Sequence, residues 1–173
     1  GYTDVIQLHQ KGIKNVVSSS GTALTIDQIT LIRRLTSNVT MLFDGDKAGV
    51  NATLRGIDII LTAGLNVNVC SFPNGEDPDS YSQDKSFDEI DDYLKNNSKD
   101  FILSKASILA QNSKNDPISK ANTINEIINS ISIIPDRIKQ EIYVKHCSSI
   151  MDISEEVLFN SLAQKTKNEI HSI

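Results

Sequence analysis

The stretch that decides the fold is MLFDGDKAGVNATLRG, residues 41–56. Its apolar start, Met41–Phe43, belongs to a run over Val39–Phe43 that is too short and too apolar for a helix and is typical of a buried strand. The strand ends abruptly in Asp44-Gly45-Asp46, and residues 47–63 then carry apolar side chains at helical spacing up to Gly64. In an open α/β sheet, ligands bind beyond the carboxyl ends of the strands. The stretch therefore predicts an α/β sheet with two aspartates at its functional edge.

Strand and helix signals alternate on both sides of this stretch. Upstream, the sequence predicts a helix over Thr3–Lys11, a short strand at Val16-Val17, and a second helix that begins at a T-x-x-Q capping box, residues 25–28. Downstream, residues 66–72 alternate apolar and polar side chains, as a half-buried strand does. Strands separated by helices indicate parallel pairing, so the fold class is α/β, with a parallel sheet flanked by helices.

The chain changes character after the sheet. Residues 73–83 contain glycine, proline and acidic residues and are predicted to be a loop. Ser86 and Glu89 then form a second capping box, and helix-period apolar patterns continue to the end of the chain. Five helices and no strand are predicted there. The sequence thus predicts two units, an α/β part over residues 1–84 and a small all-helical part over residues 85–173.

A second pair of aspartates follows the downstream strand at residues 66–72. Asp77 and Asp79 stand on either side of a proline, just as Asp44 and Asp46 stand on either side of a glycine. If the two strands are neighbours, all of these carboxylates crowd one edge of the sheet and repel one another unless a cation is present. Hard oxygen ligands suit Mg²⁺ or Mn²⁺, which bridge carboxylates to substrate phosphates. The pairs therefore predict a divalent metal site.

Simpler and different explanations of these acids stay open. Asp46 can cap its helix, and Asp77 and Asp79 can be turn residues of a non-catalytic interaction module. A calcium-binding EF-hand loop is excluded because Arg55 stands where that loop needs an acid. An aspartate-nucleophile phosphatase, with Asp44 attacking phosphate, is an alternative. That family usually has threonine or valine two positions beyond its second aspartate, where this chain has alanine.

Composition limits the class of protein. The chain has 173 residues, of which 39% are hydrophobic and 23% charged, as in globular proteins. No apolar run reaches the ~18 residues of a membrane span, and no signal segment opens the chain. Cys70 and Cys147 are predicted to be reduced core thiols of a cytosolic protein. The net charge of −5 argues against a dedicated nucleic-acid surface, although an acidic cluster can bind cations that then bind phosphates.

Several segments, in order, resemble one family. The segments GYTDVIQLHQKGI, SSSGTALT, LFDGDKAGVNATLRGIDIILTAGLNVNV and PNGEDPDSY resemble the metal-binding Toprim domain of bacterial DNA primases. The later segment IPDRIKQEIYVKHCSSIMDISEEVLFNSL resembles the end of the RNA polymerase core of those enzymes. DGDKAG alone indicates a Toprim domain, which topoisomerases and some nucleases share. The combination is more specific, and it implies a Toprim-like sheet followed by a helical subdomain.

The resemblance implies a set of site residues. Asp44 and Asp46 match the family's catalytic DxD metal ligands, and Asp77 and Asp79 match its later acidic pair at the same site. The first four residues, GYTD, match a motif whose leading glutamate would precede Gly1 and is absent from this sequence. The cofactor implied is Mg²⁺ or Mn²⁺. No nucleotide-binding residue is assigned.

The resemblance also implies an activity and its partners. A bacterial primase synthesises short RNA primers from nucleoside triphosphates on a single-stranded DNA template, in the cytoplasm and without a membrane. The family's zinc domain, the first half of the polymerase core and the region that contacts the replicative helicase are expected to lie outside this sequence. The chain is therefore expected to be a fragment that is inactive alone.

Other residues carry weaker predictions. Residues 21–23 offer backbone donors to the site, but a plain loop explains them equally well. Lys47 and Arg55 are candidates for phosphate contacts, although a solvated helix face is the simpler explanation. Asp4 adjoins the missing glutamate and is expected either to shape the site or to fray. Lys139, Lys145 and nearby basic residues are candidates for DNA contacts, with acids interspersed among them.

Overall fold

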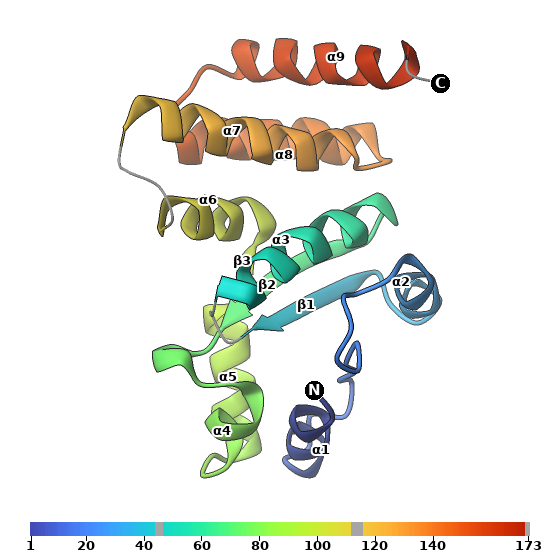
Figure 1. The fold of residues 1–173 in the computed structure, drawn as a ribbon, viewed down its shortest axis with the longest axis vertical. Coiled ribbons are helices and arrows are strands. Elements are labelled where there is room, and N and C mark those ends of the chain that lie inside the picture. The colour runs from blue at the N-terminus through green and yellow to red at the C-terminus, as the bar shows by residue number, and fades with distance from the viewer. Residues whose placement is uncertain (44–46, 112–115, 172–173) are drawn as a thin grey trace.

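The computed structural model describes residues 1–43, 47–111 and 116–171 (Figure 1). In chain order its elements are α1 (Tyr2–Gln10), α2 (Ile26–Arg33), β1 (Asn38–Phe43), α3 (Lys47–Thr62), β2 (Asn66–Ser71), η1 (Pro73–Gly75), α4 (Pro78–Ser82), α5 (Phe87–Asn97), β3 (Lys99–Asp100), α6 (Phe101–Gln111), α7 (Pro117–Ser132), α8 (Arg137–Met151) and α9 (Glu155–His171). Within the described ranges, no helix is both long and apolar enough to cross a membrane.

The sheet has three strands in the order β1-β2-β3. β1 and β2 run parallel, and their Cα register runs from Asn38 opposite Asn66 to Phe43 opposite Ser71. The predicted parallel pairing is therefore confirmed, with α3 as the connection between the two strands. Because the last residues of β1 and β2 are Cα partners, the chain leaves the two strands side by side at one edge of the sheet.

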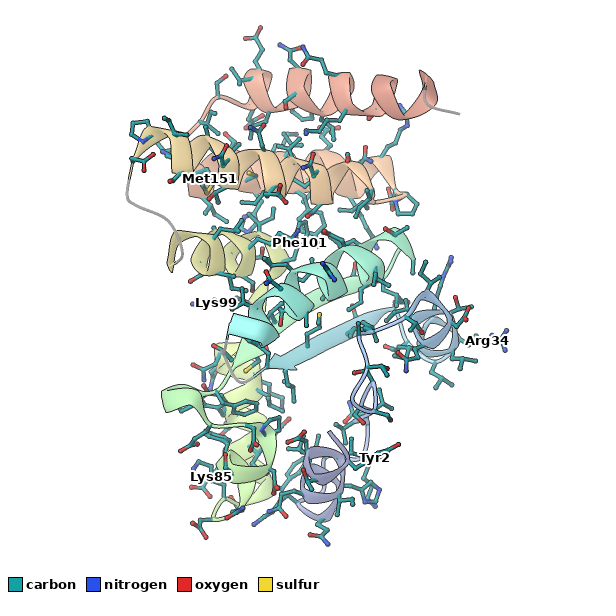
Figure 2. All side chains as sticks on the ribbon, in the orientation of Figure 1. Tyr2, Arg34, Lys85, Lys99, Phe101 and Met151 are labelled. Atoms are coloured by element: carbon teal, nitrogen blue, oxygen red, sulfur yellow. The ribbon has the colours of Figure 1, made fainter. Side chains whose placement is uncertain are left out.

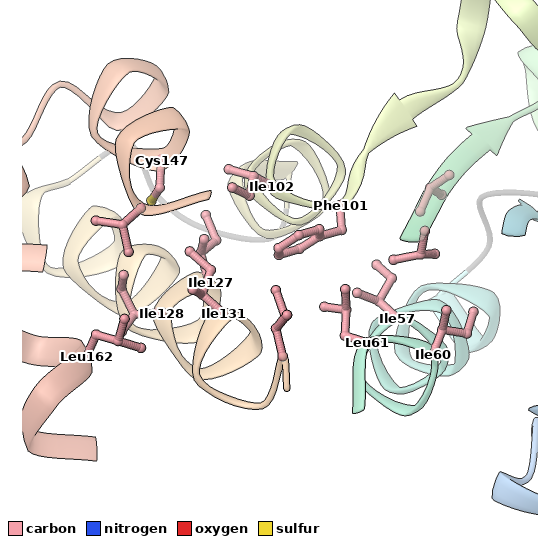
Figure 3. Close-up of a cluster of buried hydrophobic side chains, with 14 of the residues drawn as sticks. Ile57, Ile60, Leu61, Phe101, Ile102, Ile127, Ile128, Ile131, Cys147 and Leu162 are labelled. Carbon is pink, nitrogen blue, oxygen red and sulfur yellow. The ribbon is translucent and has the colours of Figure 1, made fainter. Parts of the chain in front are cut away.

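The elements stack along the long axis of the molecule (Figure 1). The sheet and α3 lie in the middle, α1, α4 and α5 lie at one end, and α7, α8 and α9 lie at the other. One hydrophobic core joins the middle to the helical end (Figure 3). Its members from α3, α6, α7, α8 and α9 include Ile57, Ile60, Leu61, Phe101, Ile102, Ile127, Ile128, Ile131, Cys147 and Leu162. The division into two units near residue 84 stays a prediction.

Local sequence signals explain where the elements begin and end. The Thr25 hydroxyl accepts the Gln28 N–H at 3.3 Å, and the Gln28 side chain accepts the Thr25 N–H at 3.0 Å, so the first predicted capping box is confirmed. The predicted capping box at residues 86–89 is also confirmed at the start of α5. Gly64 has a φ of +79°, which favours glycine and ends the segment after α3.

Two predictions about strands are wrong. Val16-Val17 forms no strand: it lies in irregular backbone, and Val17 is 72% exposed. A strand forms only where a neighbour completes its hydrogen-bond ladder, and within the described ranges the one parallel partner of β1 is β2. Conversely, Lys99–Asp100 forms a short strand inside the part predicted to be all-helical. It pairs antiparallel with β2, which therefore has a partner on each side.

The segment predicted to be a loop, residues 73–83, contains η1 and α4. Pro73 and Pro78 explain the difference, because proline fits the first turn of a helix, where its missing N–H would have no partner. The prediction that both cysteines are core thiols is confirmed. Cys70 and Cys147 are free thiols, and each is fully buried.

Candidate metal centre

The candidate metal centre is built on the neighbouring ends of β1 and β2. Phe43, the last residue of β1, is the Cα partner of Ser71, the last residue of β2. In the sequence Asp44 and Asp46 stand between Phe43 and the start of α3, but both lie outside the described residues. Asp77 and Asp79 belong to the segment that follows β2 and are described. The fold therefore brings the two chain segments that lead to the acid pairs together at one edge.

Asp77 has a defined local role as the N-cap of α4. Its carboxylate accepts the Ser80 N–H at 2.7 Å, and its own N–H donates to the Ser80 hydroxyl at 3.1 Å. These hydrogen bonds favour the ionised form and hold the pKa of Asp77 below its ordinary value. Asp77 therefore caps α4, as the simpler explanation of this residue holds. Capping leaves the side chain exposed and negatively charged, which is the state that a metal ligand needs.

Asp79 is linked to the first helix of the chain. Its N–H donates to Asp4 Oδ1 at 3.3 Å. The Asp4 side chain is only 18% exposed. Asp4 thus lies beside the later acid pair, a contact between α1 and α4 that no periodicity in the sequence signals.

An aromatic cluster supports the segment that carries Asp77 and Asp79. Phe72, Tyr81 and Tyr93 have ring centroids 4.6 to 5.8 Å apart. The Tyr93 hydroxyl donates to the Ser71 carbonyl at 2.8 Å, which ties α5 to the end of β2. This cluster was not predicted from the sequence. The signal was available, because aromatic residues make up only 5% of the chain and several fall around this segment.

The weaker site candidates have different environments. Arg55 is exposed on α3 and lines a cavity together with Ala23, the last residue of the 21–23 loop. Lys139 donates to the Asn66 side chain at 2.9 Å and so ties α8 to the start of β2. Figure 2 draws the described side chains on the ribbon. Lys145 pairs with Glu141 on its own helix at 2.8 Å. The two lysines proposed for DNA contacts are therefore engaged with the protein itself, while the Lys47 side chain lies outside what the structure describes.

The described acids fit a hard divalent ion in chemistry but not in number. Asp77 and Asp79 offer the carboxylate oxygens that Mg²⁺ and Mn²⁺ prefer. Among the described residues, no three or more histidine, cysteine, aspartate or glutamate side chains are arranged to hold a metal ion. That search includes neither Asp44 nor Asp46. Asp77 and Asp79 therefore need further ligands to hold a metal ion, and Asp44 and Asp46 are the candidates. The metal site stays a proposal.

Comparisons with known proteins agree with the resemblance in the sequence. A family model described as Toprim-like matches residues 1–82, and one described as the DnaB-helicase binding domain of primase matches residues 106–156. A DNA primase of Staphylococcus aureus is 38% identical over 162 residues, which is 94% of this chain. The chain spans 27% of the length of that relative.

Solved structures agree as well. A DNA primase domain from Pseudomonas aeruginosa has a TM-score of 0.79 and 26% identity, covering 94% of this chain and 52% of that one. A structure described as the DnaG primase catalytic domain bound to ssDNA has a TM-score of 0.75 and 25% identity, covering 90% of this chain and 50% of that one.

The helicase-related match falls in an unexpected place. The sequence analysis placed helicase contact in a region absent from this sequence, yet residues 106–156 span most of α6, α7 and α8. Those helices also belong to a fold shared with a primase catalytic domain. In sequence and fold, the chain thus matches a fragment of bacterial DNA primases.

Proposed function

We propose that this chain carries the metal-binding acids of a DNA primase, an enzyme that synthesises short RNA primers on single-stranded DNA. The observation that carries the proposal is the pairing of Phe43 with Ser71, which puts the ends of two parallel strands together where the segments bearing the acid pairs begin. The likeness to primases across 94% of the chain supports this activity over the phosphatase alternative.

In this proposal Asp44, Asp46, Asp77 and Asp79 hold Mg²⁺ or Mn²⁺. When bound, the ion supplies charge neutralisation at the triphosphate and at the attacking and leaving oxygens. The chain's own contribution is to hold charged oxygens in place. The hydrogen bonds from Ser80 keep Asp77 ionised, and the contact between Asp4 and the Asp79 backbone fixes the start of α4.

The proposed partners are those of the whole enzyme. They are nucleoside triphosphates, a single-stranded DNA template and the replicative helicase, and the place of action is the bacterial cytoplasm. A structure of a similar catalytic domain bound to ssDNA supports the template. The family's zinc domain would lie outside this sequence. The match at residues 106–156 supports a contribution of α6, α7 and α8 to helicase contact.

A priming assay tests the catalytic role. The full-length enzyme is prepared with Asp44→Ala or Asp77→Asn, and primer synthesis is measured with Mg²⁺. We expect Asp44→Ala to lower the rate by about a hundredfold or more, because lost charge stabilisation acts directly on the transition state. The matched control is Asp27→Asn, an exposed acid in the first turn of α2. Full activity of the Asp44 variant would contradict the proposal.

A binding assay tests the helicase contact. Ile138 and Ile142 are 73% and 59% exposed on α8, so replacing them by serine leaves the core intact. If residues 106–156 contribute to the contact, the double variant of the full-length enzyme binds helicase more weakly. Ile26→Ser on α2, at a site 71% exposed and outside the matched range, is the control. Equal binding by all three proteins would place the contact elsewhere in the longer protein.

A further inference from the structure

A cavity of about 330 Å³ lies between the loop that enters α2 and the exposed side of α3. Its described lining residues come from these two segments: Ala23, Leu24, Asn51, Ala52, Arg55, Gly56 and Ile59. Asp77 and Asp79, the described aspartates of the candidate metal centre, are not among them. The described lining is therefore separate from the later acid pair, and α3 begins directly after Asp46 in the sequence.

The loop wall of the cavity is held by a tight turn. Ser20 and Gly21 have φ values of +58° and +79°, and Thr22 donates through its N–H and its hydroxyl to the Ser19 carbonyl, at 3.4 and 2.8 Å. A positive φ is unfavourable for serine, so the surrounding structure must hold the turn in this one conformation. It carries the chain directly into Ala23 and the cavity wall.

The floor of the cavity depends on a glycine. Gly56 is buried on α3, and a Cβ added there would lie 2.5 Å from the Met41 methyl group and 3.8 Å from Leu24 Cδ2. Without a side chain at this position, Met41 from β1 and Leu24 from the loop approach the helix backbone. The floor of the cavity, at Gly56 and Leu24, is therefore apolar, and two polar side chains stand beside it.

Those two polar side chains are Asn51 and Arg55, which stand one turn apart on α3. Both residues are exposed, and among the described residues neither side chain has a hydrogen-bond or ion-pair partner. Arg55 is the one charged residue in the described lining, so the cavity is locally positive on a protein with a net charge of −5. A guanidinium group matches the geometry of phosphate oxygens, and an apolar floor suits a flat ring or a sugar face.

We propose that this cavity binds a nucleoside phosphate, with Arg55 on the phosphate, Asn51 on a polar edge of the base or sugar, and the floor at Gly56 under the nucleoside. The choice of a nucleotide rests on the proposed function. The same chemistry is offered by a free nucleotide and by one unit of a single-stranded nucleic acid.

An NMR titration of the chain tests the proposal. GTP is added in the presence of EDTA, so that no divalent ion takes part. We expect the amides of Ala23, Leu24 and Asn51 to shift together. Arg55→Gln should weaken binding by about tenfold, the usual effect of losing one charge-assisted contact, whereas Arg34→Gln, an exposed arginine outside the cavity, should change it by less than about twofold. Ala52→Leu, which fills the cavity without changing charge, should also abolish the shifts.

Two further arms identify the ligand. Inorganic phosphate is titrated alone, and a thymidine oligonucleotide replaces GTP. The proposal would be overturned if inorganic phosphate bound as tightly as GTP. It would also be overturned if the amide shifts caused by GTP were the same in Arg55→Gln and Ala52→Leu as in the parent chain. Tighter binding of the oligonucleotide than of GTP would support the same site and assign it to the nucleic acid. Because EDTA removes divalent ions, a failure to bind GTP would not contradict the proposed metal centre. Likewise, loss of metal binding in an Asp44 variant would not change the GTP titration.

Discussion

At the scale of single residues, Asp77 combines two requirements that usually compete. A helix cap needs a short side chain that accepts a backbone N–H, and a metal ligand needs an exposed carboxylate. Asp77 accepts the Ser80 N–H through Oδ1 and remains exposed and ionised. Serine can cap the helix but offers no carboxylate. This difference makes it possible to separate stability from metal binding at one position.

We expect Asp77→Ala to lower the free energy of unfolding by about 1 kcal/mol, the usual effect of losing an N-cap. Asp77→Ser should retain most of that stability, because its hydroxyl can cap α4, yet it should lose the contribution to metal affinity. Urea unfolding and a Mn²⁺ titration measure the two effects. Equal metal affinity of the serine variant and the parent chain would exclude Asp77 as a ligand.

The pKa of Asp77 also predicts a pH dependence. The pKa is lowered in the folded chain from its ordinary value of 3.8, so the folded state favours the ionised carboxylate. The resulting stability is present above that ordinary value and is lost as the pH falls through the lowered pKa. The free energy of unfolding of Asp77→Ser should therefore decrease less on acidification than that of the parent chain. Parallel curves would contradict this.

The two thiols give a prediction of a different kind. Burial raises the pKa of Cys147 to about 11, and burial also raises the pKa of Cys70. Because the thiolate is the reactive form, neither residue should be alkylated by iodoacetamide at pH 8 while the chain is folded. Mass spectrometry should find modification only as fast as the protein unfolds. Rapid labelling of either thiol in the native protein would contradict the described burial.

At the scale of elements, a polar contact joins α3 to α6 and α7. Lys105 on α6 is 2% exposed, and its ammonium group donates to Asp58 Oδ1 on α3 at 2.9 Å. The hydroxyl of Ser130 on α7 donates to the same oxygen at 2.7 Å. A buried ammonium group is costly without a partner, so the contact with Asp58 favours the observed packing of α6 and α7 against α3.

We expect Asp58→Ala to lower the free energy of unfolding by about 2 kcal/mol. This is less than the ~3–5 kcal/mol of a fully buried pair, because the Asp58 side chain is 41% exposed and water can reach it. Combining it with Lys105→Met should restore most of the stability, since the unpaired charge is then gone. Asp91→Ala, which breaks the exposed pair with Lys95, should change stability by less than about 1 kcal/mol. A double variant no more stable than Asp58→Ala would contradict the account.

At the scale of the whole molecule, the hydrophobic core does not stop where the sequence changes character. Phe101 at the start of α6 is fully buried and packs against Tyr143 of α8 with ring centroids 4.7 Å apart. Residues of α3 and β2 belong to the same cluster (Figure 3). A core shared in this way favours cooperative unfolding of the sheet and the helices.

Phe101→Ala should therefore destabilise the whole chain by about 3–5 kcal/mol, the usual range for a buried phenylalanine. Amide exchange should accelerate equally in β2 and in α7. Leu103→Ala, on the same helix but 37% exposed, should change stability by about 1 kcal/mol or less. Two separate unfolding transitions, with β2 unaffected by Phe101→Ala, would instead support independent units divided near residue 84.

Much of this fold could be predicted because its signals are local. The strand ending at Phe43 and the capping boxes at residues 25–28 and 86–89 depend on neighbouring residues alone. The errors are non-local. Val16-Val17 has strand composition, but among the described residues no strand pairs with it. Lys99–Asp100 is a strand only because β2 lies beside it.

The candidate site divides in the same way. The acid pairs could be found from their spacing. The sequence left open whether the strands that precede them are neighbours, and the pairing of β1 with β2 meets that condition. The bond between Asp79 and Asp4, and the cavity that joins Arg55 to Ala23, connect segments far apart in the chain. No periodicity encodes such contacts, because they depend on how α1, α3 and α4 are placed in three dimensions.

The central claim is that the two acid pairs share one divalent ion. The most direct measurement is a Mn²⁺ titration of the chain followed by NMR, in which the paramagnetic ion broadens the amides close to it. The account predicts that Gly45 and Asp79 broaden at the same low Mn²⁺ concentration, and that Asp44→Asn removes both effects together. Broadening of one segment alone, or persistence at Asp79 in the Asp44→Asn variant, would contradict it.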